Sequence, residues 1–355
     1  DGIRDDLVTG VQTCALPICG SRHPINRRCS RAFLGDARCV AGYLGGDKTM
    51  NSSHSAHYID PARVAEMDDD TLDLAERKIA GHYMHKSPWI IVFWGLTNCL
   101  AWLLLWPLVL IADLSLWIAF PVATLCCTLA YLPSHDAQHS IIAREGHKLR
   151  WLNELVGWAS LIPLAQAYSF MRATHMEHHA HTNNPELDPD FGVHAPSAWQ
   201  FLIQSIRRRQ PGSTTQQAHM NALERTGQSH LVAHALLVRA AYFACLGALA
   251  WTGHALEAFL LWWLPLHIGT TYLQFYLSWM PHHPGIEQGR YRQTRGFKSK
   301  LGNLMSMGMQ YHIIHHLYPR IPLHLTPAAF RDLLPILRRR GSDVHQWGDG
   351  DALPN

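Results

Sequence analysis

The chain has 355 residues, of which 48% are hydrophobic and 16% are charged, with a formal net charge of +3. This length suits one large domain or two small ones, and a charge this close to zero gives no sign of a nucleic-acid partner. The eight cysteines contain no CxxC pair, which excludes a common zinc or dithiol redox motif.

Residues 1–49 differ from the rest of the chain, because they are rich in Arg, Gly and Cys and lack a sustained hydrophobic period. Their run LVTGVQTCALPI resembles a translated sequencing adaptor. We therefore expect residues 1–49 to be a non-native or disordered leader, with the natural chain starting near Met50. Residues 50–87 follow as an amphipathic cytosolic lead-in, because acidic and apolar residues recur at helical spacing between Pro61 and His82.

A bilayer is crossed by a helix of roughly 20 apolar residues, and four apolar segments are predicted to be such spans. Asp113 divides the first pair, and the run Thr252-Gly253-His254 divides the second. The four predicted spans are Trp89–Ile111, Leu114–Pro133, Leu236–Trp251 and Leu256–Trp279. The sequence thus predicts an all-α integral membrane protein with four transmembrane helices in two hairpins.

Basic residues predict the orientation of these hairpins. The two short connections contain no Lys or Arg, whereas the other segments carry clusters such as Arg207–Arg209. By the positive-inside rule, both termini and the long middle segment are cytoplasmic. We expect the protein to lie in a bacterial inner membrane.

Three short motifs, HDAQH, HMEHH and HIIHH, concentrate histidines just outside the predicted spans. In a helix, residues i, i+3 and i+4 share one face, so each motif presents its imidazoles together. One iron seldom needs more than three or four protein ligands, so eight imidazoles imply two metal ions sharing a site. A ninth ligand is expected from the adjacent pair His282 and His283. The eight are His135, His139, His175, His178, His179, His312, His315 and His316.

The ligand type favours iron, although an all-imidazole site can also hold zinc or copper. The HExxH pattern of zinc hydrolases is absent from the sequence. Iron with dioxygen gives an oxidant able to take hydrogen from an unactivated C–H bond, which a lipid chain requires. Ligating histidines usually donate their second N–H to a carboxylate or carbonyl. Four nearby acids are candidates for that role: Asp136, Glu177, Asp188 and Asp190.

The runs HDAQH, THMEHHAHTNNPELDPD and QYHIIHHLYPRIP resemble the membrane fatty acid desaturase superfamily over about Trp89–Gly341. The resemblance implies a desaturase-type membrane domain at residues 88–341, a C-terminal tail at 342–355, and a cytosolic helical cap that holds two non-haem irons. It also implies O2 as co-substrate. The family's ligand pattern falls on the eight histidines above, and its additional ligand upstream of the third motif on His283 in preference to His282.

The resemblance implies removal of hydrogen from an unactivated C–H bond of a long acyl chain, with no acid or base assigned apart from the di-iron centre. The run SWMPHHPGIEQGRYRQTR looks closest to bacterial members that include beta-carotene ring hydroxylases, so a carotenoid hydroxylase is the alternative. A membrane metal transporter is a remote alternative, because transporters place their ligands within the spans.

Electrons are expected from a separate partner. The sequence contains no HPGG run of a fused cytochrome b5, no Rossmann glycine pattern and no CxxCH. The expected donor is a ferredoxin or a small cytochrome with its reductase, and the expected substrate is a membrane lipid.

Overall fold

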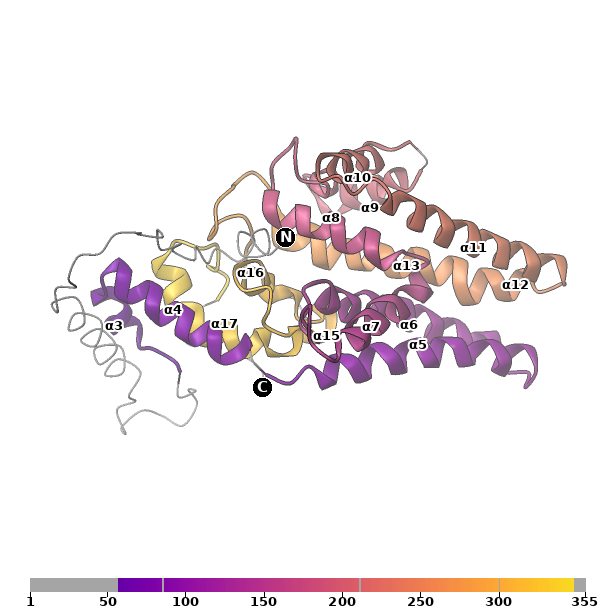
Figure 1. The fold of residues 1–355 in the computed structure, drawn as a ribbon, viewed down its shortest axis with the longest axis horizontal. Coiled ribbons are helices and arrows are strands. Elements are labelled where there is room, and N and C mark those ends of the chain that lie inside the picture. Colours follow the sequence, from indigo (N-terminus) through magenta and orange to yellow (C-terminus); the bar gives the residue numbers. More distant parts are fainter. Residues whose placement is uncertain (1–56, 85, 211, 300, 348–355) are drawn as a thin grey trace, which may run out of the picture.

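The computed structural model describes residues 57–347 except 85, 211 and 300, and every regular element in these ranges is helical (Figure 1). One isolated bridge pairs Arg295 with Asp343. The leader expected at 1–49, the first residues of the lead-in and residues 348–355 of the tail lie outside the described residues. The all-helical architecture expected from the sequence is confirmed for the described part of the chain.

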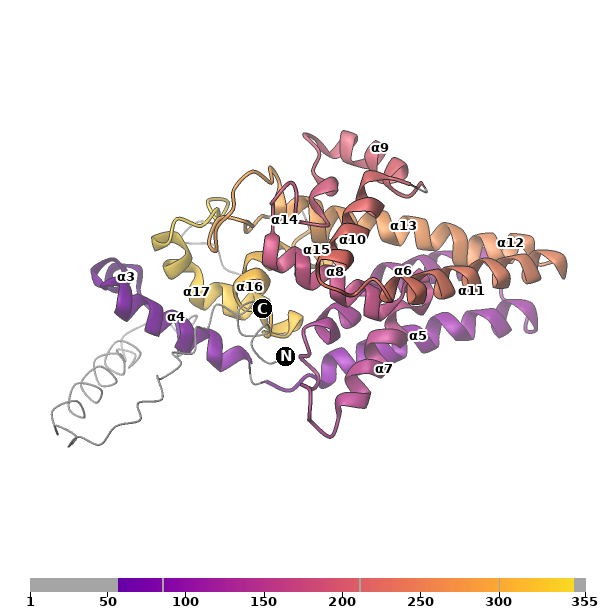
Figure 2. The same ribbon diagram turned by 45° about the horizontal axis from the view of Figure 1, so that its top comes forward.

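Three of the described helices are long and apolar enough to cross a membrane. They are α5 (Trp89–Leu110), α6 (Leu116–Gln138) and α11 (Leu231–Trp251). The α5–α6 connection and the connection that follows α11 lie at the same end of the molecule (Figures 1 and 2). Helix α11 begins at Leu231, so it is longer at its start than the predicted third span, which began at Leu236. Helix α6 continues past its predicted end at Pro133 into the first histidine motif.

The segment predicted as a fourth span is helical throughout but is not one regular α-helix. Five elements follow one another without a gap: α12 (Ala255–Ala258), the π-helical η3 (Phe259–Trp263), α13 (Leu264–Leu273), the π-helical η4 (Gln274–Trp279) and α14 (Met280–His282). The buried Trp102 indole of α5 donates at 3.1 Å to the carbonyl of Leu261 in η3.

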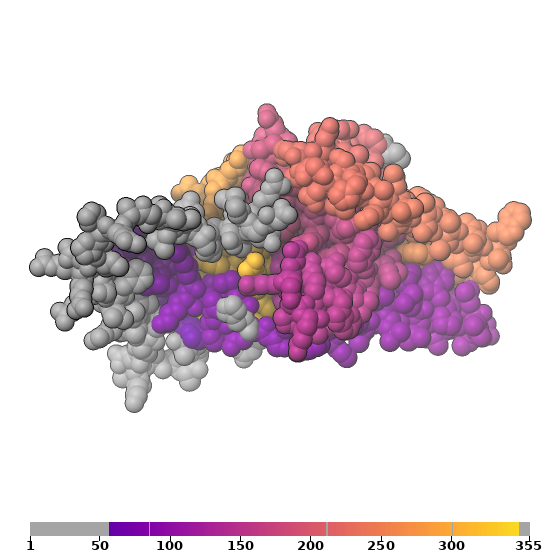
Figure 3. Space-filling model, viewed as in Figure 1, coloured from indigo at the N-terminus to yellow at the C-terminus, as the bar shows by residue number. Residues whose placement is uncertain are grey.

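A second core lies at the opposite end of the molecule from the hairpin turns (Figure 1). It joins α3 (Pro61–Glu66) and α4 (Asp69–Met84) to α16 (His312–Leu317) and α17 (Thr326–Arg339). The buried residues of α4 recur at helical spacing, as expected for an amphipathic lead-in. Val344 and Trp347 belong to the same core, so the predicted tail is packed at least as far as Trp347. We call this second core, with the helices α3, α4, α16 and α17, the cap. Figure 3 shows α5 and the α11–α12 region projecting away from the cap.

The middle segment contains α7 (Arg150–Leu161), α8 (Tyr168–His181), α9 (Ala198–Arg208) and α10 (Thr214–Arg225), with short 3₁₀ turns η1 (Ile162–Leu164) and η2 (Phe191–Val193). Two of these helices leave a stripe of large apolar side chains exposed, and they lie on opposite sides of the bundle (Figure 2). The stripe of α7 is Trp151, Leu155 and Trp158, and that of α9 is Trp199, Leu202, Ile203 and Ile206.

A buried joint holds α6, α7 and α8 together. The Tyr168 hydroxyl, at the start of α8, donates at 2.9 Å to the carbonyl of Ala137 in the first histidine motif. Asn153 of α7 donates to the same carbonyl at 3.0 Å. The Tyr168 ring lies against the backbone of Gly157, where an added Cβ would be 2.4 Å from a ring carbon.

Gly157→Ala is therefore expected to lower the free energy of unfolding by about 1–3 kcal/mol, the usual cost of overpacking a core. Tyr168 has no simple escape, because its hydroxyl is fixed to Ala137. Thermal unfolding of the detergent-solubilised protein measures the loss. Gly247→Ala on α11 is the control, because no atom lies within 4 Å of the added Cβ there. Equal melting temperatures for the two variants would contradict the steric argument.

Candidate metal centre

The three histidine motifs lie on three different helices that come together in the structure. His135 is on the last turn of α6 and His139 caps that helix. The second motif ends α8, and the third forms most of α16. The eight histidines of the motifs therefore come together from segments that are up to 181 residues apart, from His135 to His316. Seven of them are buried, and His179 is half-buried.

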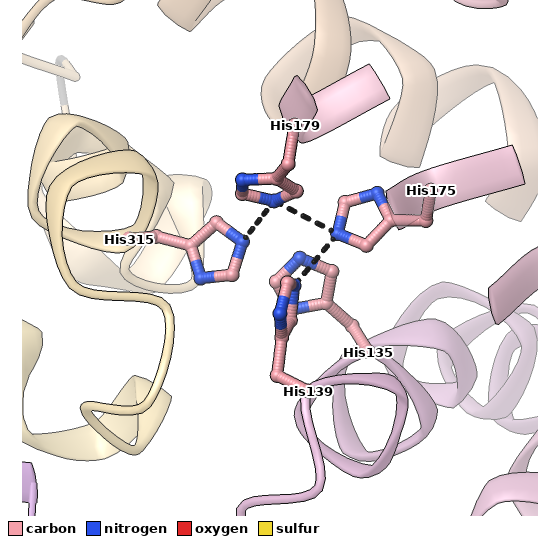
Figure 4. A group of neighbouring side chains, drawn as sticks. All are labelled: His135, His139, His175, His179 and His315. Carbon is pink, nitrogen blue, oxygen red and sulfur yellow. Dashed lines mark hydrogen bonds between the residues drawn. The ribbon is translucent and has the colours of Figure 1, made fainter. Parts of the chain in front are cut away.

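Five of these histidines form the first histidine group (Figure 4). Their candidate ligand nitrogens all lie within 4.8 Å of one another. The group comprises His135, His139, His175, His179 and His315.

Adjacent Nε2 atoms in the first histidine group face one another at hydrogen-bond distance. The Nε2 of His175 lies 3.0 Å from that of His139 and 3.2 Å from that of His179. The Nε2 of His179 is also 2.9 Å from that of His315. A neutral imidazole nitrogen either donates one proton or accepts, so this chain of contacts requires one proton to serve two acceptors. Both nitrogens of buried His135 have no hydrogen-bond partner. The arrangement suits a cation at the common centre.

The second histidine group lies beside the first. The candidate nitrogens of His178, His282 and His316 lie within 4.8 Å of one another. His312 completes this group, because its Nε2 is 3.1 Å from the Nε2 of His316. Neither ring nitrogen of buried His282 has a hydrogen-bond partner. Together the two groups contain nine imidazoles, the number of ligands expected from the sequence.

The two candidates for the ninth histidine, His282 and His283, lie in different surroundings. The structure places His282 in the second histidine group and His283 outside both groups, against the Trp279 ring at a centroid distance of 4.9 Å. The reason is local: α14 ends at His282, and His283 adopts extended backbone angles that turn its side chain away. Both residues line a cavity of about 260 Å³, so His282 also forms part of a wall open to this space.

Asp188 is the candidate carboxylate with the closest contact to the histidines. It is buried, and its Oδ1 accepts from the Nδ1–H of His178 at 2.9 Å. Its Oδ2 accepts from the backbone N–H of Asn183 at 2.8 Å. This leaves the Nε2 of His178 to face the other histidines, which is the arrangement typical of metal ligands held by a carboxylate.

The other three candidate carboxylates have different partners. Asp136 is buried with its Oδ1 3.8 Å from the Nδ1 of His135, while its Oδ2 accepts from the backbone of Leu323. Glu177 pairs with Arg225 at 2.8 Å. Asp190 lies with its Oδ1 3.4 Å from the Nε2 of His219. Glu177 and Asp190 thus contact neither histidine group through any hydrogen bond in the described residues.

Burial sets the protonation state of most of the histidines. Loss of solvation, aided by repulsion between neighbouring imidazoles, lowers the pKa well below the ordinary value for His175, His179, His312, His315 and His316. These side chains are therefore neutral near pH 7, the form that binds metals. His178 differs, because burial lowers its pKa but the Asp188 carboxylate outweighs burial and raises it to about 9. Asp188 supports positive charge at this position.

Three polar residues near the second histidine group were not anticipated. The Thr182 hydroxyl lies 3.4 Å from the Nδ1 of His316, and the Gln293 amide lies 3.5 Å from the same atom. Asn183 donates to the Gln293 carbonyl at 2.8 Å, with its own backbone in the left-handed region at φ 62°. The run HTNN directly after the second motif was the available signal, since Asn tolerates positive φ better than most residues.

Comparison with known proteins places this site in a family. The sequence model described as fatty acid desaturase matches residues 114–348, which include all three histidine motifs. A fatty acid conjugase of Calendula officinalis is 21% identical over 299 residues, which cover 73% of each chain.

Shorter matches point the same way. An sn-1 oleoyl-lipid 12-desaturase of Synechocystis sp. is 31% identical over 95 residues, so the chain spans about a quarter (26%) of that relative. A zeaxanthin 4-ketolase of Chlamydomonas reinhardtii is 35% identical over 78 residues, 21% of this chain and 17% of the ketolase. With its apolar helices and two adjacent histidine groups that fit a di-iron site, this chain belongs to the fatty acid desaturase family.

Proposed function

We propose that the protein uses two irons and O2 to remove hydrogen from an unactivated C–H bond in the long acyl chain of a membrane lipid. The observation that carries the proposal is the pair of adjacent histidine groups at the end of the apolar helix α6. A reaction centre at that position meets a substrate that is dissolved in lipid. Two of the relatives are named as oleoyl-lipid desaturases, which supports an acyl chain.

The two histidine groups would each hold one iron. The first offers five imidazoles and the second offers four, counting His312. The bound irons supply the oxidising chemistry with O2. The protein's own part is to bury the imidazoles, to keep most of them neutral, and to orient His178 through Asp188. Thiolates are absent from both groups, which favours iron over a zinc or copper site of the sulfur type.

We propose four membrane spans in two hairpins, with the cap, the site and both termini on the cytoplasmic side of a bacterial inner membrane. The unbroken helical run 255–282 supplies the fourth span beside α5, α6 and α11. The exposed apolar stripes of α7 and α9 support a membrane surface at that level, because such faces are suited to the lipid interface. The basic run Arg207–Arg209 ends α9 and suits anionic headgroups.

The electron donor is proposed to be a separate ferredoxin or small cytochrome with its reductase. Support comes from the sequence, which carries no motif of a fused donor. We expect activity with purified protein only when a reductant system of this kind is added.

Lipid analysis tests the proposed reaction. The full chain is expressed in a carotenoid-producing bacterial host, and total lipids are compared by mass spectrometry with those of a His315→Ala strain. Fatty acids lighter by two hydrogens are expected with the unaltered chain alone. Carotenoids heavier by one oxygen would instead establish the alternative, a ring hydroxylase; one matched relative is named a zeaxanthin 4-ketolase. Identical lipids in the two strains, with the iron-loaded protein and its reductant system present, would contradict both.

A further inference from the structure

Glu76 is a buried acid outside the region that defines the family. It lies on α4, which precedes the first long helix, whereas the family match begins at residue 114. The residue is only 2% exposed. A carboxylate in such a position is costly to bury unless charges and hydrogen bonds compensate it. The partners of the Glu76 carboxylate therefore determine how its burial is compensated.

Two tyrosines donate to Glu76, one to each oxygen. The Tyr318 hydroxyl donates to Oε1 at 2.7 Å, and the Tyr291 hydroxyl donates to Oε2 at 2.8 Å. The guanidinium groups of Arg290 and Arg340 lie at 3.9 and 4.0 Å from these oxygens. Both carboxylate oxygens are therefore engaged, and the positive charges beside them compensate the burial.

Tyr318 connects Glu76 to the third histidine motif. It lies two residues after His316, and its backbone N–H donates to the Ile314 carbonyl at 2.8 Å, closing the end of α16. A fixed Tyr318 hydroxyl therefore fixes the last turn of this short helix. Helix α16 has six residues and depends on such outside contacts, because short helices are not stable alone.

Tyr291 connects Glu76 to the same histidine through a second segment of the chain. It lies two residues before Gln293, whose amide is 3.5 Å from the Nδ1 of His316. Gln293 is held in turn by Asn183, and Asn183 by Asp188. One carboxylate thus anchors the two segments that flank His316. This network reaches the second histidine group, while the first group has no described hydrogen bond to it.

A second buried pair on the same helix provides a comparison. The Tyr83 hydroxyl of α4 donates to Oδ2 of Asp332 on α17 at 2.6 Å. This pair also joins α4 to α17, but α17 carries none of the nine histidines. Loosening α4 in general and releasing His316 in particular can therefore be separated by variants of the two pairs.

We propose that Glu76 is a positioning residue for the second metal: through Tyr318 and Tyr291 it holds His316 at the geometry needed to bind the ion. This inference rests on the proposed two-metal centre. By this inference α4, which lies before the residues matched by the family, supports the metal site. Residues that only orient a ligand typically change metal affinity by about 10- to 100-fold.

The test measures metal release from the complete chain. Purified protein is loaded with Fe²⁺ without oxygen, and the release of metal to a chromophoric chelator is followed in time for the unaltered chain, Glu76→Ala, Tyr318→Phe and Tyr83→Phe. We expect one of two metals to leave about 10- to 100-fold faster in Glu76→Ala and faster to a smaller extent in Tyr318→Phe. The slow phase and the kinetics of Tyr83→Phe should match those of the unaltered chain. Asp70→Ala, an exposed acid of the same helix, is the surface control.

Three results would overturn the inference. The first is unchanged release of both metals from Glu76→Ala. The second is equal acceleration of both metals, and the third is the same acceleration in Tyr83→Phe, since either means a general loosening of the cap. If Glu76→Ala does not fold, Tyr318→Phe against Tyr83→Phe decides, because each loses one hydroxyl. Failure of the unaltered chain to bind two metals would instead count against the proposed function.

Discussion

Replacing His315 with alanine should abolish turnover and remove metal from the first histidine group. Changes to residues that merely orient a ligand cost about 10- to 100-fold, so loss of a ligand itself should lower activity by more than about 100-fold. His315 is 2% exposed, and its Nε2 lies 2.9 Å from that of His179. Iron content per chain and product formation measure the two effects, and His175→Ala should behave in the same way.

The matched control for this change is His181→Ala. His181 lies on α8 two residues after His179, but it faces Glu177 at 3.7 Å and belongs to neither group. It should keep its iron and its activity. A fully active, iron-replete His315→Ala protein would refute the assignment of the site.

The second large effect is expected from Asp188→Asn. The carboxylate accepts three hydrogen bonds, from the Nδ1–H of His178 and from the backbone N–H groups of Asn183 and Asp190. An amide has one acceptor oxygen, so its NH₂ group must face at least one of these donors. His178 then loses the charge that raises its pKa, and one amide can no longer hold both His178 and the backbone of Asn183. We expect the affinity for one of the two metals to fall by about 10- to 100-fold.

Competition with a chromophoric chelator measures that affinity. Glu177→Gln is the control, because Glu177 directly precedes His178 in the sequence but pairs with Arg225 and not with a histidine of either group. A metal affinity of Asp188→Asn equal to that of Glu177→Gln would show that the contact with His178 has no role in binding.

The histidine motifs were predictable because their spacing obeys a local rule, but their division between two groups was not. In HMEHH, the first and last histidines join the first group while His178 joins the second. Likewise, neighbours His315 and His316 go to different groups. This division depends on how α8 and α16 approach each other, which only tertiary packing determines.

The different positions of His282 and His283 were not predictable for another reason. It depends on whether α14 ends one residue earlier or later, and helix ends are the least certain part of any sequence-based assignment. The π-helical turns of the predicted fourth span were also beyond reach, because an apolar run of that length gives no sign of local irregularity. By contrast, the apolar character of α5, α6 and α11 was evident from composition.

The nine histidines belong to four elements, α6, α8, α14 and α16, that are spread along the chain from His135 to His316. During synthesis, neither group is complete until α16 has left the ribosome and docked, so metal insertion must come late in biogenesis. Any ion then bound contributes its binding free energy to the folded state, because the unfolded chain offers no preformed site. Iron supply would thus govern how much of this protein survives in the membrane as well as how fast it works.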